Sequence, residues 1–172
     1  MSDDQCTVPI SVTVNGKEHA AHVRVDLTLV EFLREDLQLY SCRETCGIGV
    51  CGTCTVLLDG SPVSGCLTFA YKADGHELTT SEGLGEGNRL HPVQQALLDE
   101  QAFQCSFCTP GFAVSIAAMV AERERSGIQD QDPDLHTHLS GHLCRCGCYL
   151  EIIAAAKRVA ASGAGNPDGL DT

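Results

Sequence analysis

The sequence of 172 residues lacks tryptophan, and its aromatic residues amount to only 5%. A core without large rings is thin, and small domains of this kind usually rely on disulfides or metals for stability. Basic residues are also scarce, with 11 Lys and Arg against 23 Asp and Glu and a net charge of -12. This balance argues against a nucleic-acid or anionic-membrane partner, because phosphate contacts need clusters of Lys and Arg.

Long apolar segments are missing as well. No apolar run reaches the roughly 18 to 20 residues that a membrane-spanning helix needs. The first residues, Met1 to Cys6, are acidic and lack the apolar segment of a secretory signal. We therefore expect a cytoplasmic protein without a membrane span, and export in complex with a signal-bearing partner stays open.

Cysteine, by contrast, is abundant, with 11 residues. An odd number in a chain expected to stay in a reducing compartment disfavours a disulfide framework. Most of the cysteines form two sets of four, each large enough to enclose one metal centre. The first set is Cys46, Cys51, Cys54 and Cys66, and the second set is Cys105, Cys108, Cys144 and Cys146. Metal ligation is the better interpretation of this count.

The first set has the spacing Cys46-x4-Cys51-x2-Cys54, closed by a distant fourth cysteine, which is typical of a plant-type [2Fe–2S] cluster. Gly47, Gly49 and Gly52 would allow the loop to turn tightly and to point N–H groups at the sulfurs. Zinc is the alternative metal, and the glycine-laden loop argues against it. We interpret Cys42 as a small buried apolar residue, because pairing it with Cys51 would break the spacing.

The second set combines Cys105-x2-Cys108 with Cys144-x-Cys146. A Cys-x-Cys pair places two sulfurs on adjacent sides of one centre, which fits zinc less well than an iron–sulfur cluster. Each pair precedes a predicted helix, whose positive N-terminal end favours thiolates. Cys148 leaves an ambiguity, because Cys146 and Cys148 have the same spacing as Cys144 and Cys146.

The first half of the chain, residues 6–82, is predicted to be a strand-rich domain of the β-grasp kind. Period-two alternation and the turn signal Asn15-Gly16 predict a hairpin, and Thr28 is a predicted helix N-cap. The predicted strands are Val8–Val14, Lys17–Val25, Thr53–Leu58 and Glu77–Thr79, with a helix at Leu29–Leu37 and a turn at Asp59-Gly60.

The second half, residues 89–162, is predicted to be an all-α four-helix bundle, joined to the first by a glycine-rich linker over residues 83–88. Its predicted helices are Pro92–Gln101, a segment from Thr109-Pro110 to Ser126-Gly127, Asp134–Leu139 and Tyr149–Ala161. Thr109 is the expected N-cap, with Pro110 at the first helical position. Residues 163–172 are expected to form a mobile tail. The predicted fold class is therefore α+β.

Short motifs around both sets carry a resemblance to a known family. They read Cys51-Gly52-Thr53-Cys54-Thr55-Val56, Gln104-Cys105-x-Phe107-Cys108-Thr109-Pro110-Gly111 and Leu143-Cys144-Arg145-Cys146. In this order and spacing, the chain resembles the small iron–sulfur subunit of the molybdenum hydroxylases, the xanthine dehydrogenase and aldehyde oxidoreductase family. The resemblance covers about Val8 to Ala161.

The resemblance implies a β-grasp ferredoxin domain and a four-helix bundle that each bind one [2Fe–2S] cluster through the two cysteine sets. It further implies that the second cluster lies beside a molybdopterin-type molybdenum cofactor on a large partner subunit. The first cluster would face FAD in a medium subunit, or a cytochrome acceptor, in a hetero-trimer or its dimer. Gln104 matches a glutamine that binds the pterin, and Cys146 matches the ligand nearest to it.

Three residues depart from the family pattern, since His142, Gly147 and Cys148 stand where Asn, Thr and Gly are usual. We interpret Cys148 as an inert neighbour of the cluster and His142 as a packing residue. A stronger hypothesis is that His142 tunes the cluster or relays a proton.

The leading functional hypothesis is an electron-transfer subunit of an oxidoreductase complex that passes electrons singly. No catalytic residue and no substrate site are expected on this chain. The alternatives are a free-standing ferredoxin-like carrier and a zinc-stapled adaptor.

Overall fold

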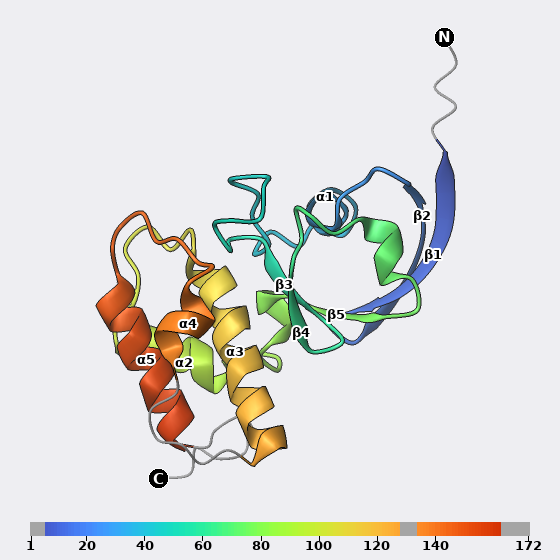
Figure 1. The fold of residues 1–172 in the computed structure, drawn as a ribbon. Helices are drawn as coiled ribbons and strands as arrows, with labels where there is room; N and C mark the ends of the chain where they lie inside the picture. Colours follow the sequence, from blue (N-terminus) through green and yellow to red (C-terminus); the bar gives the residue numbers. More distant parts are fainter. Residues whose placement is uncertain (1–5, 128–133, 163–172) are drawn as a thin grey trace.

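The computed structural model of the protein describes residues 6–127 and 134–162, in which a sheet half and a helical half lie side by side (Figure 1). The tail predicted for residues 163–172 lies outside the described residues. Within the described ranges, no helix combines the length and the apolar character that a membrane crossing requires.

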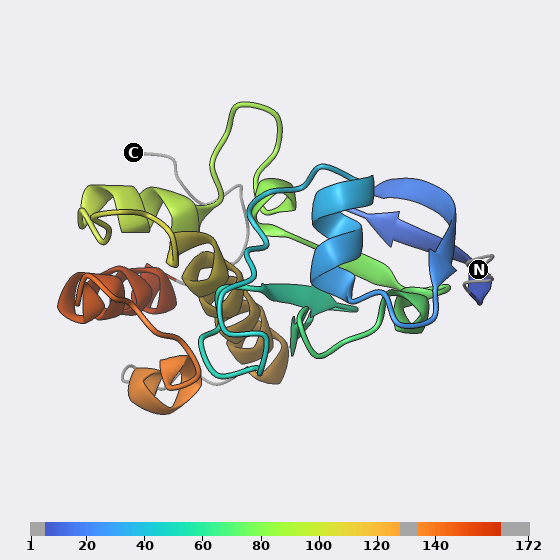
Figure 2. The same ribbon diagram turned by 90° about the horizontal axis from the view of Figure 1, so that it is seen from above.

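The sheet half forms one five-stranded sheet in the order β2-β1-β5-β3-β4. Its strands are β1 (Thr7–Val14), β2 (Lys17–Arg24), β3 (Thr55–Leu58), β4 (Ser61–Ser64) and β5 (Glu77–Thr79). The central pair, β1 and β5, is parallel, and the other neighbours are antiparallel. Helix α1 (Leu29–Glu31) crosses one face of this sheet (Figure 2). The β-grasp prediction is therefore confirmed.

Local sequence signals explain the hairpin that starts this sheet. Asn15 and Gly16 both have positive φ values, 50° and 75°, as a type I′ turn requires. The turn sets Val14 opposite Lys17. This register turns Ile10, Val12 and Val14 toward the core, where they are almost fully buried.

The helix over the sheet begins where the sequence predicts and changes character after one turn. Thr28 caps it through a reciprocal capping box with Glu31. From Phe32 to Asp36 the helix is π-helical, and the Leu37 N–H donates to the Phe32 carbonyl at 3.3 Å. Phe32 and Leu33 are fully buried against the sheet. The sequence did not indicate this wider turn.

The helical half contains α2 (Pro92–Asp99), α3 (Thr109–Ser126), α4 (Leu135–Leu139) and α5 (Tyr149–Ser162). They form the predicted small bundle around a core that includes Leu97, Phe112, Ile116, Leu135 and Ile152. Gly127 ends α3 in the left-handed conformation, with a φ of 62°, as the Ser126-Gly127 pair predicted.

The start of α3 differs from the prediction. Cys108, and not Thr109, occupies the N-cap position, so Thr109 is already the first helical residue. The Cys108 backbone stays in the helical region, with a φ of -85° and a ψ of -15°. The predicted N-cap was therefore wrong, because the cysteine loop runs directly into the helix.

Helix α3 is the central helix of the molecule. Every residue from Gly111 to Val120 is buried. Phe112, Ile116, Met119 and Val120 face the bundle core. Val114 and Ala118 pack on the opposite side, against Leu57 of β3. This helix therefore joins the two halves. A single apolar stripe in the sequence predicts only one buried face and does not indicate this role.

The predicted linker, residues 83–88, makes contacts with both halves. A short 3₁₀ helix at Ser81–Gly83 leads into it, and Leu84 packs against the bundle core and also against the cluster that contains Leu57 of β3. Glu86 and Arg89 exchange backbone hydrogen bonds of 3.0 and 2.9 Å. The exact limits at residues 6–82, 83–88 and 89–162 stay a prediction.

Candidate metal centres

The first cysteine loop is shaped by glycine. Gly47, Gly49 and Gly52 have positive φ values of 65°, 75° and 70°, as the prediction of a tight loop requires. The backbone N–H groups of Ile48 and Val50 consequently face the Cys46 sulfur. These hydrogen bonds lower the pKa of the Cys46 thiol to about 6.

The structure brings the first set together as two pairs of thiols. Cys46 is hydrogen-bonded to Cys51, and Cys54 to Cys66. The β3–β4 hairpin places Cys66, and a bond from Gly65 N to the Cys54 carbonyl (3.1 Å) holds the two segments together. Burial raises the pKa of the Cys66 thiol to about 11.

The second set forms two pairs in the same manner. Cys105 is hydrogen-bonded to Cys146, and Cys108 to Cys144. The first pair reaches the surface, since Cys105 is exposed and Cys146 half-buried. Its backbone hydrogen bond from Phe107 lowers the pKa of the Cys105 thiol. The second pair is buried, and desolvation raises the pKa of the Cys108 thiol to about 12.

This pairwise arrangement distinguishes between the metals weighed above. A [2Fe–2S] cluster takes four cysteine thiolates on two irons, whereas zinc gathers four ligands around one point. Among residues 6–127 and 134–162, no group of three or more His, Cys, Asp or Glu side chains converges on a single-ion site. Two thiol pairs in each set, with backbone N–H donors beside them, fit a two-iron cluster.

Two further buried cysteines stand beside the sets. The Cys42 thiol donates to the Cys54 carbonyl at 3.4 Å, and burial raises its pKa. Cys148 lies in the bundle core, where its thiol contacts Cys144 and burial raises its pKa. Cys105 contacts Cys146, whereas the thiol contact of Cys148 is with Cys144. This geometry favours Cys146 as the ligand, although the assignment of individual ligands stays a prediction.

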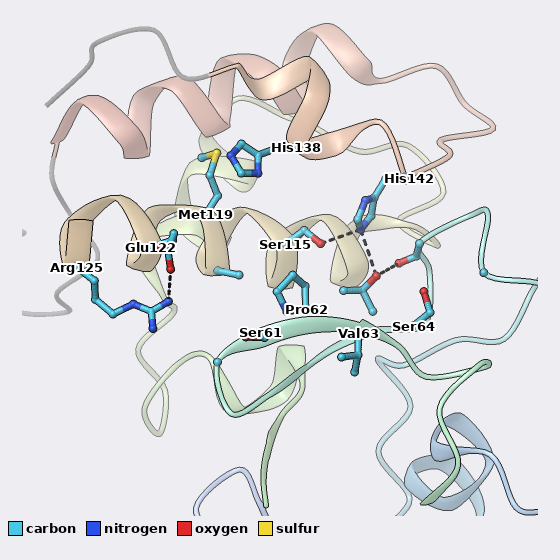
Figure 3. Close-up of a pocket in the computed structure, with 16 residues that line it drawn as sticks. Ser61, Pro62, Val63, Ser64, Ser115, Met119, Glu122, Arg125, His138 and His142 are labelled. Carbon is cyan, nitrogen blue, oxygen red and sulfur yellow. Dashed lines mark hydrogen bonds and ion pairs between the residues drawn. The ribbon is translucent and has the colours of Figure 1, made fainter. Parts of the chain in front are cut away.

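His142 lies between the halves and lines a cavity of about 340 Å³ between α3 and the β3–β4 hairpin (Figure 3). Its Nε2 is 2.9 Å from Ser115 Oγ and 3.4 Å from Thr55 Oγ1. Its ring centroid is 4.9 Å from that of Phe112, and burial lowers its pKa. These contacts support a packing role. The tuning hypothesis stays untested.

The two cysteine sets meet at the contact between the halves. The Leu143 N–H, next to Cys144, donates to the Cys51 carbonyl at 3.0 Å. Gly111 of α3 lies so close to the first loop that an added Cβ would be 2.3 Å from the Gly52 carbonyl oxygen. Arg43, beside the first set, donates to two carbonyls of the second loop.

Sequence reasoning missed Arg43 and the close approach of Gly111. A signal for Arg43 was available, because it is a basic residue beside a cysteine cluster in a chain that has few basic residues. Gln104, predicted to bind a pterin, is exposed next to the exposed Cys105. Its predicted role is untested.

Comparison with known proteins identifies the family. A 2Fe-2S iron-sulfur cluster binding domain matches residues 12–80, and a [2Fe-2S] binding domain matches residues 80–157. The xanthine dehydrogenase iron-sulfur-binding subunit of Escherichia coli O157:H7 is 39% identical over 147 residues, covering 86% of this chain and 91% of that protein. The chain belongs to the small [2Fe–2S] subunits of the molybdenum hydroxylases.

Other relatives agree with this assignment. The aldehyde oxidoreductase iron-sulfur-binding subunit of Escherichia coli K12 is 37% identical over 169 residues, covering 89% of this chain and 72% of that protein. The structure of quinoline 2-oxidoreductase from Pseudomonas putida matches with a TM-score of 0.79 at 35% identity, over 92% of this chain and 98% of that one. Aldehyde oxidoreductase from Desulfovibrio desulfuricans matches with a TM-score of 0.81 at 36% identity. There, 89% of this chain covers 17% of a much longer chain.

The family assignment confirms the central predictions. This small subunit carries two [2Fe–2S]-binding domains, one on a β-sheet and one on a helical bundle. It is an iron–sulfur electron-transfer subunit of molybdenum hydroxylase complexes, and thus part of an oxidoreductase. Membership of this family argues against the zinc-stapled adaptor and the free-standing carrier.

Proposed function

We propose that this subunit conducts electrons singly from a molybdopterin-type cofactor on a large partner subunit to FAD on a medium subunit. A [2Fe–2S] cluster, when bound, accepts and releases one electron at a time. The eight cysteines of the two sets would hold the two clusters. A hetero-trimer or its dimer, with a cytochrome as the alternative acceptor, is the assembly that this proposal implies, and the cytoplasm its expected compartment.

One observation supports this proposal most strongly, the hydrogen bond that joins the two sets. The Leu143 N–H is bonded to the carbonyl of Cys51, and Leu143 precedes Cys144 directly. A single hydrogen bond therefore connects a predicted ligand residue of the first set to the backbone leading to a predicted ligand of the second. Such a contact brings the two sets close together, as electron transfer from one centre to the other requires.

The exposure of the sets supports a direction. Cys105, Cys146 and the exposed Gln104 form the accessible side of the second set, suited to meet a pterin on the large subunit. At the first loop, Ile48 is 66% and Val50 53% exposed, and these apolar side chains suit contact with a second partner. The second thiol pair of each set is buried in the core of its own half.

Purification of the chain with its natural partners tests the proposal. We expect a complex that contains molybdenum, FAD and two [2Fe–2S] signals in electron paramagnetic resonance. Rapid mixing with substrate and freeze-quenching should show the second-set signal before the first-set signal. Recovery of this chain only as a lone monomer, or reduction of the first-set signal first, would contradict it.

A further inference from the structure

Arg43 reaches from the first cysteine loop to the second. Its Nη1 donates to the carbonyls of Ser106 at 2.8 Å and of Phe107 at 2.7 Å. Its guanidinium carbon lies 5.0 Å from the centroid of the Phe107 ring. Ser106 has a left-handed φ of 59°, a conformation that costs a non-glycine residue free energy. The guanidinium thus stabilises a strained loop between Cys105 and Cys108.

The backbone of Arg43 is itself fixed to the first set. The Arg43 N–H donates to the Thr53 carbonyl at 3.1 Å, and Thr53 Oγ1 donates to the Arg43 carbonyl at 2.9 Å. The same hydroxyl oxygen is 3.2 Å from Cys51 Sγ. Because both ends of Arg43 are held, its charge has a defined position between the two sets.

The two carbonyls that Arg43 binds belong to peptide groups whose N–H ends face sulfur. The Ser106 carbonyl shares its peptide group with the Phe107 N–H, which is hydrogen-bonded to the Cys105 thiol. The Phe107 carbonyl shares its peptide group with the Cys108 N–H, which faces the Cys108 thiol. A cation on a peptide oxygen polarises the group and strengthens its N–H as a donor.

This arrangement favours the reduced state of a cluster at the second set. Reduction adds one negative charge near the sulfurs, and stronger N–H donors stabilise that charge. We propose that Arg43 is a positioning residue that raises the reduction potential of the second cluster by polarising these two peptide groups. The inference rests on the proposed function, because it assumes that the second set holds a [2Fe–2S] cluster.

The chain offers a matched control in Arg34. Its Nη1 also donates to two carbonyls, those of Cys42 at 3.0 Å and Tyr40 at 3.4 Å. Its guanidinium carbon lies 5.5 Å from the Tyr40 ring centroid. Arg34 and Arg43 line the same surface pocket. Arg34 therefore matches Arg43 in charge, chemistry and location, but these contacts stay within the sheet half.

The test is a redox titration of the assembled complex, followed by electron paramagnetic resonance, in wild type, Arg43→Gln and Arg34→Gln. A Cys146→Ser variant assigns the second-set signal as the one that it perturbs. In Arg43→Gln, the electron distribution between the two clusters should shift about tenfold toward the first cluster, as one charge-assisted hydrogen-bond system is lost. In Arg34→Gln, the second-set signal should titrate as in wild type. Arg43→Lys keeps the charge and should restore part of the shift.

Several results would overturn the inference. One is an unchanged second-set potential in Arg43→Gln, another is an equal shift in Arg34→Gln, and a third is an Arg43→Lys variant that behaves like Arg43→Gln. If Arg43→Gln does not assemble, Arg43→Met, which keeps the apolar stem against Phe107, and Arg43→Lys take its place. An unchanged potential in every variant that assembles then refutes the proposal. Absence of two [2Fe–2S] signals in wild type would instead refute the proposed function, so the two failures are distinguishable.

Discussion

The two cysteine sets pair their thiols in the same way, but the chain assembles them by different means. In the first set, Cys46, Cys51 and Cys54 lie on one glycine-rich loop, and a hairpin returns Cys66 to it. In the second, the two halves of the set are separated along the chain by α3 and α4. Loop conformation therefore shapes the first site, whereas helix packing shapes the second.

In both sets, one thiol pair includes a solvent-accessible cysteine, Cys46 or Cys105, and the other pair is buried. Backbone N–H donors lower the pKa of Cys46 and Cys105, and burial raises that of Cys66 and Cys108. Each site thus has a more exposed cysteine whose pKa backbone donors lower and a buried cysteine whose pKa desolvation raises, and backbone donors also lower the pKa of the buried Cys144. This similarity across two unrelated scaffolds teaches that the chemistry of the ligand set, and not the fold around it, is the common requirement.

The largest expected difference concerns iron removal. Stripping both clusters with chelator and reductant should destabilise the bundle by about 3 kcal/mol, because the second set cross-links distant segments. The sheet half should lose less stability, since its hairpins and its parallel strand pair do not depend on the cysteine ligands. The protection of backbone amides from hydrogen exchange in α3 and α5, compared with that in β1 and β2, measures both losses of stability in one sample. Equal loss of protection in the two halves would remove this distinction between them.

Replacement of Cys146 or Cys148 tests which of these two cysteines is a ligand of the second cluster. Cys146→Ala should lose the second cluster and with it about half of the iron per chain. Cys148→Ala should keep the iron and cost about 1 kcal/mol of stability, as expected for truncating a small buried side chain. Iron analysis and the visible spectrum report the result. Iron loss in Cys148→Ala with full occupancy in Cys146→Ala would exchange the two roles.

The contact between the halves depends on the small size of Gly111. Gly111→Ala places a Cβ 2.3 Å from the Gly52 carbonyl oxygen, and α3 must then move away from the first loop. We expect a loss of about 2 kcal/mol, since overpacking outweighs the better helix propensity of alanine. Gly141→Ala is the matched control, because no heavy atom lies within 4 Å of its added Cβ. Thermal unfolding of the two variants should differ clearly, and equal stabilities would show that the close approach is unimportant.

The smallest expected effect is a loss of folding stability at acidic pH. The Glu82 carboxylate accepts hydrogen bonds from Ser41 N at 2.8 Å and from the Ser41 and Thr80 hydroxyls. Burial opposes but does not cancel these bonds, so the pKa of Glu82 is below its usual 4.5. Its contribution is therefore complete above pH 4.5 and is lost as the pH falls through the lower folded-state value.

Glu82→Gln tests this dependence. Because the side chain is partly accessible to solvent, we expect the substitution to cost only about 1 kcal/mol at pH 7 and nothing at a pH below the folded-state pKa. Unfolding curves at pH 7 and in acid measure the difference. A cost that is the same at both pH values would contradict an ionised Glu82 as the source.

Local signals in the sequence predicted much of the fold and both cysteine sets. The turn at Asn15-Gly16, the capping residue Thr28 and the helix end at Gly127 each depend on the conformation of a few neighbouring residues. Strand β5 occurs at the predicted residues, Glu77–Thr79. The misplaced N-cap at Thr109 and the π-helical turn after Glu31 are errors of the same local reasoning, since contacts with other segments overrode the propensities.

The sequence alone determined the cysteine spacing, the family and the kind of centre, because ligand spacing along a loop is a local property. Only the tertiary structure decided that α3 is buried on both sides, that Cys105 meets Cys146, and that Arg43 reaches the second loop. These facts depend on which distant segments pack together. Such contacts arise from the sum of many weak interactions, and no short motif in the chain records them.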